Sequence, residues 1–196
     1  MQVAVLLYPG CIFFEIALAT ETLAKHLPVL YYTPDGQAHQ ASNGSTISSA
    51  GNLSALRSAS TRAVLIPGGD PQALLLPTRS ATDALQAQAK AGAVIAGICA
   101  GNLVMASAGL MLGRRGTHNY TAEYAPPEKV AATHDFWSGM HFVRANLVQD
   151  GNLITAQPWA YRQYTAAVGR ALRVLSEAQA AELESYIARR TYSDAS

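Results

Sequence analysis

The sequence predicts an α/β fold in which helices cover both faces of a mainly parallel sheet. Short apolar runs rich in β-forming residues alternate four times with segments of helical period within about 110 residues. Each run is continuously apolar, which is typical of strands that are buried on both faces. Three of the runs end in small or turn-forming residues, in the segments YPG, PGG and GICAG. Because sites in open parallel sheets form at the carboxyl ends of the strands, candidate functional residues are expected in these turns.

The first half of the chain supplies strands and helices in regular order. A helix is expected over Phe14–Leu27, where apolar residues recur every three or four positions before Pro28. A second helix is expected from about Thr78 to Lys90, and a third directly after the fourth strand. The polar stretch 34–54 is expected to hold turns and a small edge strand. The four strands are expected at residues 3–7, 29–32, 63–66 and 94–98.

The second half is less regular. The segment from His118 to Trp137 is interpreted as a polar, aromatic-containing connection. Asp150-Gly151 between two β-forming runs predicts a hairpin with arms at 142–147 and 153–155. Two further helices are expected at 161–175 and 178–190, followed by a frayed end at 193–196.

Composition excludes several classes of protein. The chain has 196 residues, 49% hydrophobic and 14% charged, which suits one domain (1–196) with a dense core and some surface buried in an oligomer. A formal net charge of +1 gives no attraction to nucleic acid or to an anionic membrane. No apolar run reaches about 18 residues, and the N-terminus lacks the features of a signal peptide. Two cysteines do not make a disulfide framework, so we expect a cytoplasmic protein.

Cys99 stands at the most informative turn. Gly97-Ile98-Cys99-Ala100-Gly101 has the spacing G-x-C-x-G between a strand and a helix, which is the spacing of a nucleophile elbow with cysteine in place of serine. Such a turn strains the residue at its tip and places it beside the unpaired N–H groups of a helix N-terminus. The partial positive charge of the helix N-terminus favours a thiolate and lowers the cysteine pKa. The alternative is an ordinary buried cysteine.

Several motifs in order along the chain resemble the ThiJ/PfpI family of the class I glutamine amidotransferase-like superfamily. They are AVLLYPGCIFFEIA, VLIPGGD, GICAG, GLMLGRRGTHNY and DGNLITA, and the resemblance as a whole covers roughly Val3 to Leu175. The resemblance implies a flavodoxin-like three-layer sandwich and a homodimer or larger homo-oligomer. It implies no cofactor. The histidines show no paired spacing that would predict a metal site.

The resemblance also implies a set of site residues. An acid at the place of Glu15 hydrogen-bonds the cysteine sulfur in the family, and the N–H groups of Gly69 and Ala100 would form an oxyanion hole. From the residues alone, Glu15 could equally cap its helix, and Pro67-Gly68-Gly69 could be a plain strand-ending turn. A carboxyl that is partly desolvated beside a thiolate should have a raised pKa and could shuttle a proton.

The resemblance makes His118 the candidate for the third catalytic member, because some relatives carry a histidine in the stretch that reads GTHN here. If His118 points away, Cys99 and Glu15 form a dyad only. A subgroup with the histidine directly after the cysteine is not matched, because Ala100 stands there. The alternatives are a surface histidine in a polar loop and an alignment that slips by one residue. Gly68, Cys11 and Asn119 are expected to line the pocket, with Cys11 either a small apolar filler or a resolving thiol.

Three functions are compatible with these residues. The first is a cysteine-dependent hydrolase, hydratase or glyoxalase-like enzyme that acts on a small molecule, with Cys99 as nucleophile and Glu15 as proton shuttle. The second is a redox or stress-response protein in which Cys99 is oxidised to sulfenate or sulfinate. The third is a binding module that uses the same pocket. Because one fold serves many chemistries, the sequence does not name the substrate.

Overall fold

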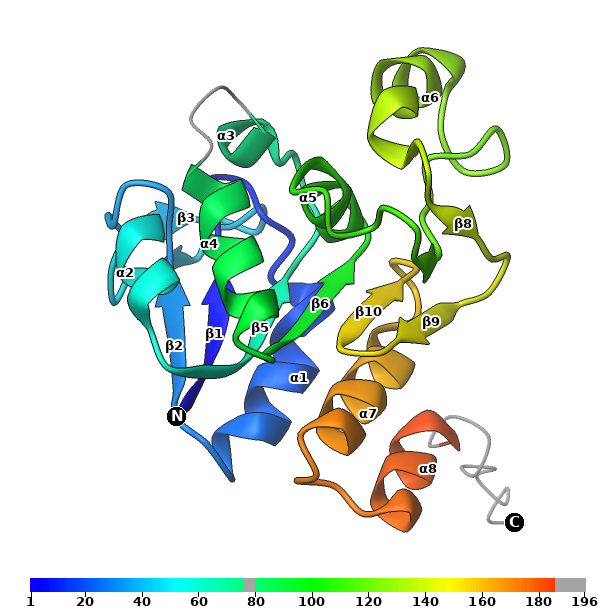
Figure 1. The fold of residues 1–196 in the computed structure, drawn as a ribbon. Coiled ribbons are helices and arrows are strands. Elements are labelled where there is room, and N and C mark those ends of the chain that lie inside the picture. The colour runs from blue at the N-terminus through cyan, green and yellow to red at the C-terminus, as the bar shows by residue number, and fades with distance from the viewer. Residues whose placement is uncertain (76–79, 186–196) are drawn as a thin grey trace, which may run out of the picture.

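The computed structural model describes residues 1–75 and 80–185, and its centre is a six-stranded sheet (Figure 1). Neighbouring strands pair in parallel except at one edge, where the last pair is antiparallel. This confirms the α/β fold class and all four strands predicted in the first half. In spatial order the strands are β2 (Val29–Tyr32), β1 (Gln2–Leu6), β5 (Thr61–Ile66), β6 (Val94–Ile98), β10 (Leu153–Ala156) and β9 (Leu147–Asp150).

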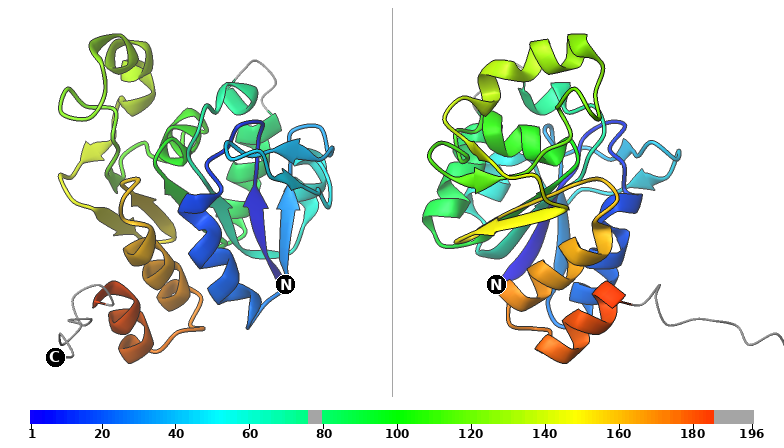
Figure 2. Two further views of the ribbon diagram at one scale, coloured as in Figure 1. Left: turned by 180° about the vertical axis from the view of Figure 1, so that it is seen from behind. Right: turned by 90° about the vertical axis from the view of Figure 1, so that its right-hand side faces the viewer.

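Helices cover both faces of this sheet. On one face α1 (Phe14–Ala24) packs against α7 (Tyr161–Ala171), which in turn contacts α8 (Glu177–Ser185). The opposite face carries α4 (Ser80–Lys90), as the views from the front and from behind show (Figures 1 and 2). Two short helices, α2 (Leu53–Ser58) and α5 (Gly101–Ser107), complete the layers. The strands read as continuous apolar runs because side chains on both of their faces are buried.

The hairpin at Asp150-Gly151 forms, but its first arm is shorter than predicted. Gly151 adopts a left-handed φ of 62° and β9 begins only at Leu147. His141–Phe142 instead form strand β8, which pairs in parallel with β7 (Arg115–Gly116). The expectation of one arm over 142–147 is therefore wrong, because two short strands with different partners divide that region.

Helix ends also differ from the sequence prediction. The helix α1 stops at Ala24 rather than Leu27, although the Leu27 N–H still donates to the Leu23 carbonyl. The helix α7 stops at Ala171, because Arg173 takes a left-handed φ of 55° that ends the helix. The predicted start near Thr78 and the segments 186–190 and 193–196 lie outside the described residues.

The predicted polar connection contains regular structure that the sequence prediction missed. It holds α6 (Pro127–Thr133) and the 3-10 helix η1 (His134–Trp137), which stand above the carboxyl ends of the strands (Figure 1). Pro127 in the first turn of α6 is a helix-start signal, since proline there lacks only an N–H that would be unpaired anyway. The helix α3 (Gln72–Leu75) also lies in this upper region.

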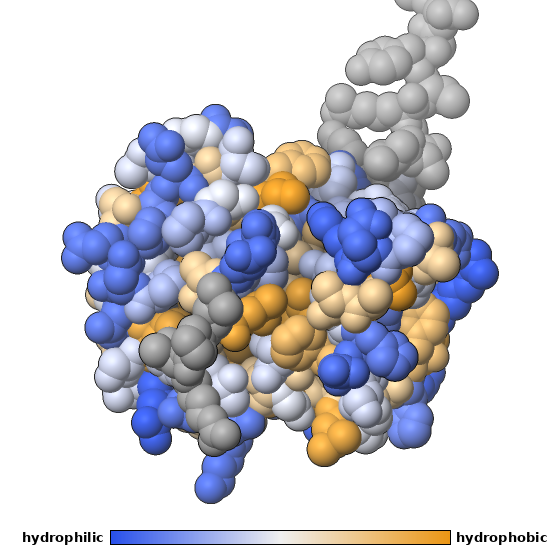
Figure 3. Space-filling view, turned by 90° about the horizontal axis from the view of Figure 1, so that it is seen from above, coloured by the Kyte–Doolittle hydropathy of each residue, from blue (hydrophilic) through white to orange (hydrophobic). Residues whose placement is uncertain are grey.

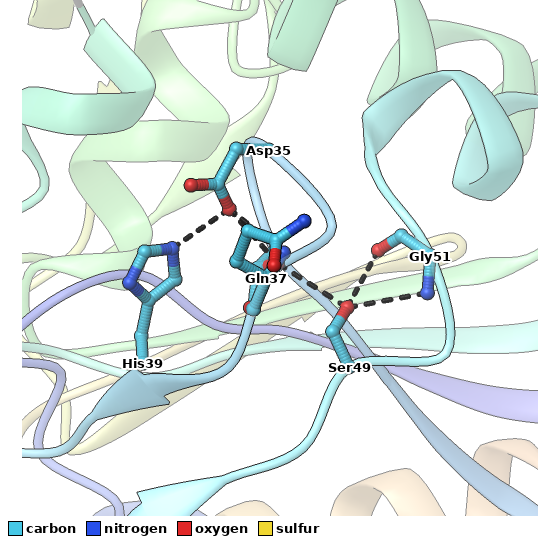
Figure 4. A network of polar contacts seen from close by, with 6 residues as sticks. Asp35, Gln37, His39, Ser49 and Gly51 are labelled. Carbon is cyan, nitrogen blue, oxygen red and sulfur yellow. Dashed lines mark hydrogen bonds and ion pairs between the residues drawn. The ribbon is translucent and has the colours of Figure 1, made fainter.

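The stretch 34–54 forms a two-stranded antiparallel sheet of its own, from β3 (His39–Gln40) and β4 (Thr46–Ile47). A network of polar side chains fixes it beside the end of β2 (Figure 4). One Asp35 oxygen lies 2.8 Å from His39 Nε2 and accepts from the Gln37 N–H at 3.0 Å. Ser49 Oγ donates to the Gly51 carbonyl at 2.8 Å. We interpret this network as structural, because its contacts are explained by the turn it holds.

Candidate active site at Cys99

Cys99 lies at the tip of the turn between β6 and α5. Its φ is +56°, one of two positive values among the described non-glycine residues, which confirms the strained conformation expected of an elbow. The two glycines of G-x-C-x-G are needed on either side. A Cβ on Gly101 would collide with the Ile66 carbonyl, and one on Gly97 would lie 2.7 Å from Met105 Sδ. The turn can therefore form only where both positions lack a side chain.

Glu15 projects from the first turn of α1 to the sulfur of Cys99. Its side chain is buried, with 4% of the residue exposed, and its carboxyl lies near the Cys99 sulfur, since both groups border the same position at Gly68. Glu15 Oε2 accepts a hydrogen bond from the Gly68 N–H at 2.7 Å. A Cβ on Gly68 would lie 2.5 Å from Glu15 Oε2 and 2.7 Å from Cys99 Sγ. Gly68 thus leaves the space in which acid and thiol meet.

The electrostatics of the pair differ from what the helix N-terminus predicts. Burial raises the pKa of Glu15 to about 7, against the opposing hydrogen bonds from Gly68 and Cys99. Burial, and then the Glu15 charge, raise the pKa of the Cys99 thiol to about 12, so the expected lowering is wrong. Only the Ala100 N–H and the Asn119 amide favour the thiolate, and they do not offset those two effects. With Glu15 ionised, Cys99 therefore stays a thiol.

The residue that reaches the sulfur from the third side is Asn119 and not His118. Asn119 Nδ2 donates to Cys99 Sγ at 3.8 Å. The His118 ring stacks on Trp137, with centroids 3.9 Å apart, and its Nδ1 accepts from the Tyr120 N–H at 3.1 Å. Burial lowers the pKa of His118 to about 4, which leaves the ring neutral. The structure thus places His118 in a buried aromatic cluster, so it is neither beside the sulfur nor a surface histidine, and both of those expectations are wrong.

The proposed oxyanion-hole residues lie beside the sulfur. Gly69 and Ala100 both line the pocket above Cys99, and the Ala100 N–H is bonded to the sulfur. Gly69 has a φ of +125°, and a Cβ there would lie 2.9 Å from Cys11 Cα. Cys11 is therefore behind the Gly69 backbone and is buried, with 2% exposed, so it does not line the pocket as expected. Gly68 is likewise not part of the pocket lining, whereas Asn119 is.

The pocket above Cys99 has a volume of about 640 Å³, and residues of both α3 and α6 line it. Seen from above, apolar residues gather near the middle of this face and polar residues surround them (Figure 3). Asp70 and Lys129 supply charged groups to its wall. Its larger apolar side chains are Ile12, Leu75, Leu103, Tyr120 and Phe136. The sequence prediction missed the contribution of residues 125–136, because it read that stretch as a connection.

Within residues 1–75 and 80–185, no group of three or more His, Cys, Asp or Glu side chains could hold a metal ion. In the same residues, no helix combines the length and the apolar character needed to cross a bilayer.

Comparison with known proteins points to one family. The model of the DJ-1/PfpI family matches residues 1–168. A search of curated protein sequences finds no match. Among solved structures, a DJ-1 superfamily protein of Agrobacterium tumefaciens superimposes with a TM-score of 0.80 at 20% identity, over 96% of this chain and 98% of that one.

Two further solved structures show the same fold. The Drosophila melanogaster DJ-1beta protein gives a TM-score of 0.75 at 23% identity, over 98% of this chain and 100% of its own. A DJ-1 superfamily protein of Salmonella typhimurium, solved as a cysteine-to-alanine mutant, gives 0.74 at 24% identity over 97% and 99%. At these identities the likeness shows the shared flavodoxin-like fold alone.

Proposed function

The chain belongs to the DJ-1/PfpI family, and on this premise we propose that it is an enzyme that attacks small electrophilic compounds with Cys99. The observation that carries the proposal is the buried Glu15 carboxyl, which lies with the Cys99 sulfur against Gly68 at the base of a pocket. An acid held against a thiol on a strained elbow is a costly arrangement for a merely structural role.

The high pKa of the thiol determines how attack would begin. A thiol with a pKa of about 12 holds little thiolate at neutral pH, so it needs a base at the moment of attack. Glu15, with a pKa of about 7, is ionised to a useful extent at that pH and already lies near the thiol. Glu15 therefore acts as the base, and it does not wait beside a preformed thiolate.

The proposed step moves one proton and forms one bond. The Cys99 S–H proton passes to the Glu15 carboxylate, the sulfur forms a bond to the carbonyl carbon, and the carbonyl π electrons move to its oxygen. The N–H groups of Gly69 and Ala100 would donate to that oxygen. The protonated Glu15 then returns its proton to the oxygen or to a leaving group, which gives an adduct or a thioester that water can hydrolyse.

The pocket favours a small and largely apolar substrate. Its volume of about 640 Å³ suits a small molecule, and its wall is mostly aliphatic and aromatic. Asp70 and Lys129 could orient one polar end of such a compound. Hydrolysis and glyoxalase-like chemistry begin with the attack on a carbonyl described above. Hydration of an isocyanide would begin with the same transfer of the thiol proton to Glu15, after which the sulfur bonds to the isocyanide carbon and Glu15 returns the proton to that carbon. These are the reaction classes to test.

Redox sensing is the second candidate, because Cys99 is partly exposed at the pocket and donors surround its sulfur. The Ala100 N–H, the Asn119 amide and a protonated Glu15 could each stabilise the oxygens of a sulfinate. Cys11 is poorly placed as a resolving thiol, because it is buried behind Gly69.

A homodimer or larger homo-oligomer is part of the proposal. Phe14, which is 63% exposed, packs against Tyr161 with ring centroids 5.1 Å apart, so an apolar patch lies on the outside of α1 and α7. Light scattering would test the association. A single domain over residues 1–196 and a cytoplasmic location also remain proposals.

The test is a screen of 2-oxoaldehydes, isocyanides and activated amides with wild type, Cys99→Ser and Glu15→Gln. Turnover that is lost in Cys99→Ser and strongly reduced in Glu15→Gln supports the enzyme. Absence of turnover, together with a peroxide-dependent gain of 16 or 32 mass units at Cys99 (about one or two oxygen atoms), supports the sensor. Turnover that survives in Cys99→Ser rejects the proposed nucleophile.

A further inference from the structure

The carboxyl end of β10 holds the backbone of the Cys99 turn. The carbonyl of Ala156, the last residue of the strand, accepts from the Cys99 N–H at 3.0 Å and from Asn102 Nδ2 at 2.8 Å. Asn102 lies in the first turn of α5 and is fully buried. One carbonyl group of the sheet therefore fixes both the nucleophile elbow and the helix that follows it.

The next residue, Gln157, holds the loop on the other side of the sulfur. Gln157 is 3% exposed, and its Nε2 donates to Thr117 Oγ1 at 2.9 Å and to the His118 carbonyl at 3.0 Å. Because a carbonyl only accepts, the bond to His118 also fixes which end of the Gln157 amide faces the loop. That carbonyl belongs to the peptide group that joins His118 to Asn119. The bond therefore fixes the backbone directly before Asn119, whose side chain reaches Cys99.

Asn119 has no second anchor for its side chain. Its Nδ2 donates to Cys99 Sγ at 3.8 Å, and within residues 1–75 and 80–185 its Oδ1 has no hydrogen-bond partner. A hydrogen bond weakens as it lengthens, so a contact of this length is sensitive to a small displacement of the loop. The backbone of Asn119 therefore determines whether its amide reaches the sulfur.

Gln157 is held rigidly, although one of its own atoms is unsatisfied. Its N–H donates to the Asn146 carbonyl at 2.8 Å, and its carbonyl accepts from the Ala160 N–H at 2.9 Å. Its Oε1 is buried without a hydrogen bond, which destabilises a fold. This unpaired acceptor partly offsets what the two bonds to the loop contribute to stability, but it does not change their effect on the position of Asn119.

We propose that Gln157 is a positioning residue, which places Asn119 Nδ2 against Cys99 Sγ. Ala156 fixes the backbone that carries the sulfur and Gln157 fixes the backbone that carries the donor, so two adjacent residues set the distance between them. The Asn119 donor favours the thiolate form of Cys99, which is the form that attacks. The inference deepens the proposed function and rests on it for the catalytic use of Cys99.

The test is a double-mutant cycle on the rate of Cys99 alkylation by iodoacetamide at pH 9, in the full chain carrying Cys11→Ser. Asn119→Ala removes the donor and should slow alkylation about tenfold. Gln157→Met removes both bonds to the loop at similar side-chain volume and should slow alkylation about threefold or more. With Asn119→Ala already present, Gln157→Met should have no further effect, because it acts only through Asn119. Effects that multiply, or an unchanged rate in either single variant, would overturn the proposal.

The charges around the sulfur stay the same in this comparison. Among the described residues, the titratable side chains that interact electrostatically with Cys99 are Glu15, Tyr8 and Tyr120. Glu15, with a pKa of about 7, is ionised at pH 9, and burial raises the pKa of both phenols well above that pH. A difference in rate between the variants therefore reports the Asn119 donor.

Gln88→Met is the matched control, because Gln88 is a buried glutamine far from the pocket lining. It is 2% exposed in α4, and its Nε2 donates to the Leu56 and Ala59 carbonyls at 2.7 and 2.9 Å. Gln88→Met should lower the Tm much as Gln157→Met does and should leave the alkylation rate unchanged. Slower alkylation in Gln88→Met would show a general loosening of the fold and would overturn the proposal.

Gln157→Asn repeats the cycle if Gln157→Met does not fold. It keeps the amide on a side chain one methylene shorter, which cannot reach both acceptors, so its slowing of alkylation should also disappear in Asn119→Ala. Slowing that persists there would overturn the proposal. Alkylation needs no substrate, so an absence of turnover in the screen would leave this test intact. Turnover together with a failed cycle would keep the enzyme and overturn only the role of Gln157.

Discussion

The turns after β1 and after β6 each place a cysteine near Gly68-Gly69, and their differences show what makes a thiol reactive. Cys99 has a left-handed backbone, an acid near its sulfur and an open pocket above it. Cys11 has none of these features, and its pKa is raised chiefly by burial. The residue type and the position at the sheet edge are shared. Reactivity is therefore expected to follow from the local backbone and from the partner group.

The largest expected difference between the two thiols is in turnover. Cys99→Ser should lower kcat/KM by a thousandfold or more (~10³, the usual scale for removal of a nucleophile), because the hydroxyl is a far weaker nucleophile. Cys11→Ser should change kcat/KM by about twofold at most, since Cys11 does not line the pocket. Steady-state kinetics on the substrate found in the screen measures both. Comparable losses of kcat/KM in Cys99→Ser and Cys11→Ser would show that the two thiols do not differ in their role.

The second largest expected effect on kcat/KM comes from filling the space at Gly68, which borders both Glu15 and Cys99. Gly68→Ala places a methyl group between Glu15 and Cys99, so we expect kcat/KM to fall about a hundredfold and unfolding free energy to fall by about 1–3 kcal/mol. Gly10→Ala is the matched control, because its Cβ would meet nothing within 4 Å although its φ is +74°. It should lose about 1 kcal/mol of stability through backbone strain and keep its activity. Full activity in Gly68→Ala would show that Glu15 and Cys99 need not meet.

Stability against pH tests the buried acid by itself. The pKa of Glu15 is raised to about 7 in the folded protein, so its favourable contribution is complete below its unfolded pKa and is lost as pH rises through about 7. Glu15→Gln removes this loss and should stabilise the protein by roughly 2–3 kcal/mol more at pH 8 than at pH 4. Glu21→Gln, on the exposed side of the same helix, is the control and should show no such trend. Chemical denaturation at several pH values gives the comparison, and parallel curves for both variants would contradict it.

The smallest difference separates the neighbours His118 and Asn119. Asn119→Ala removes a donor to the sulfur, so kcat/KM should fall about tenfold while the fold is kept. His118→Asn should change kcat/KM by no more than about threefold, although loss of its stacking on Trp137 should lower the Tm by a few degrees (about 2–4 °C per kcal/mol for a chain of this size). A tenfold loss in His118→Asn with an unchanged Tm would restore the histidine to the site.

The central sheet and the region that covers its carboxyl edge show how much of this could be predicted. Strands β1 and β6 are continuous apolar runs that end at turn residues, and these two signals locate the strands in the sequence. The elbow at Cys99 could be predicted because it comes directly after β6. The region 114–146 has no such period, because its short strands and helices depend on distant partners such as Thr155, which bonds the Thr117 N–H. The sequence therefore could not predict that residues 125–136 line the pocket, or where the His118 ring lies.

The pKa of the thiol was also beyond the sequence, for a different reason. Local sequence shows the helix N-terminus that favours a thiolate, but it does not show how deeply the sulfur is buried or that Glu15 lies against it. Both of those effects come from tertiary structure, and in this structure they outweigh the helix. The turn alone therefore predicts only how the helix N-terminus affects the pKa of a cysteine, and not how burial and neighbouring charges affect it.

Glu15 and Cys99 should titrate as a pair, because the charge of each group affects the pKa of the other. The rate of Cys99 alkylation by iodoacetamide, measured from pH 5 to 10, shows whether they do. The protein should carry Cys11→Ser, so that one thiol is measured. At pH 9 iodoacetamide reacts with the thiolate already present and needs no base, and the Glu15 charge opposes that thiolate. Glu15→Gln should therefore alkylate faster than its parent at pH 9, by about tenfold for each unit of lowered pKa. Glu15→Leu also removes the charge, but unlike the amide of Glu15→Gln it offers no N–H to the thiolate. Its profile should therefore lie between those of the parent and Glu15→Gln. Three overlapping profiles would show that Glu15 does not act on the sulfur, and would contradict the account.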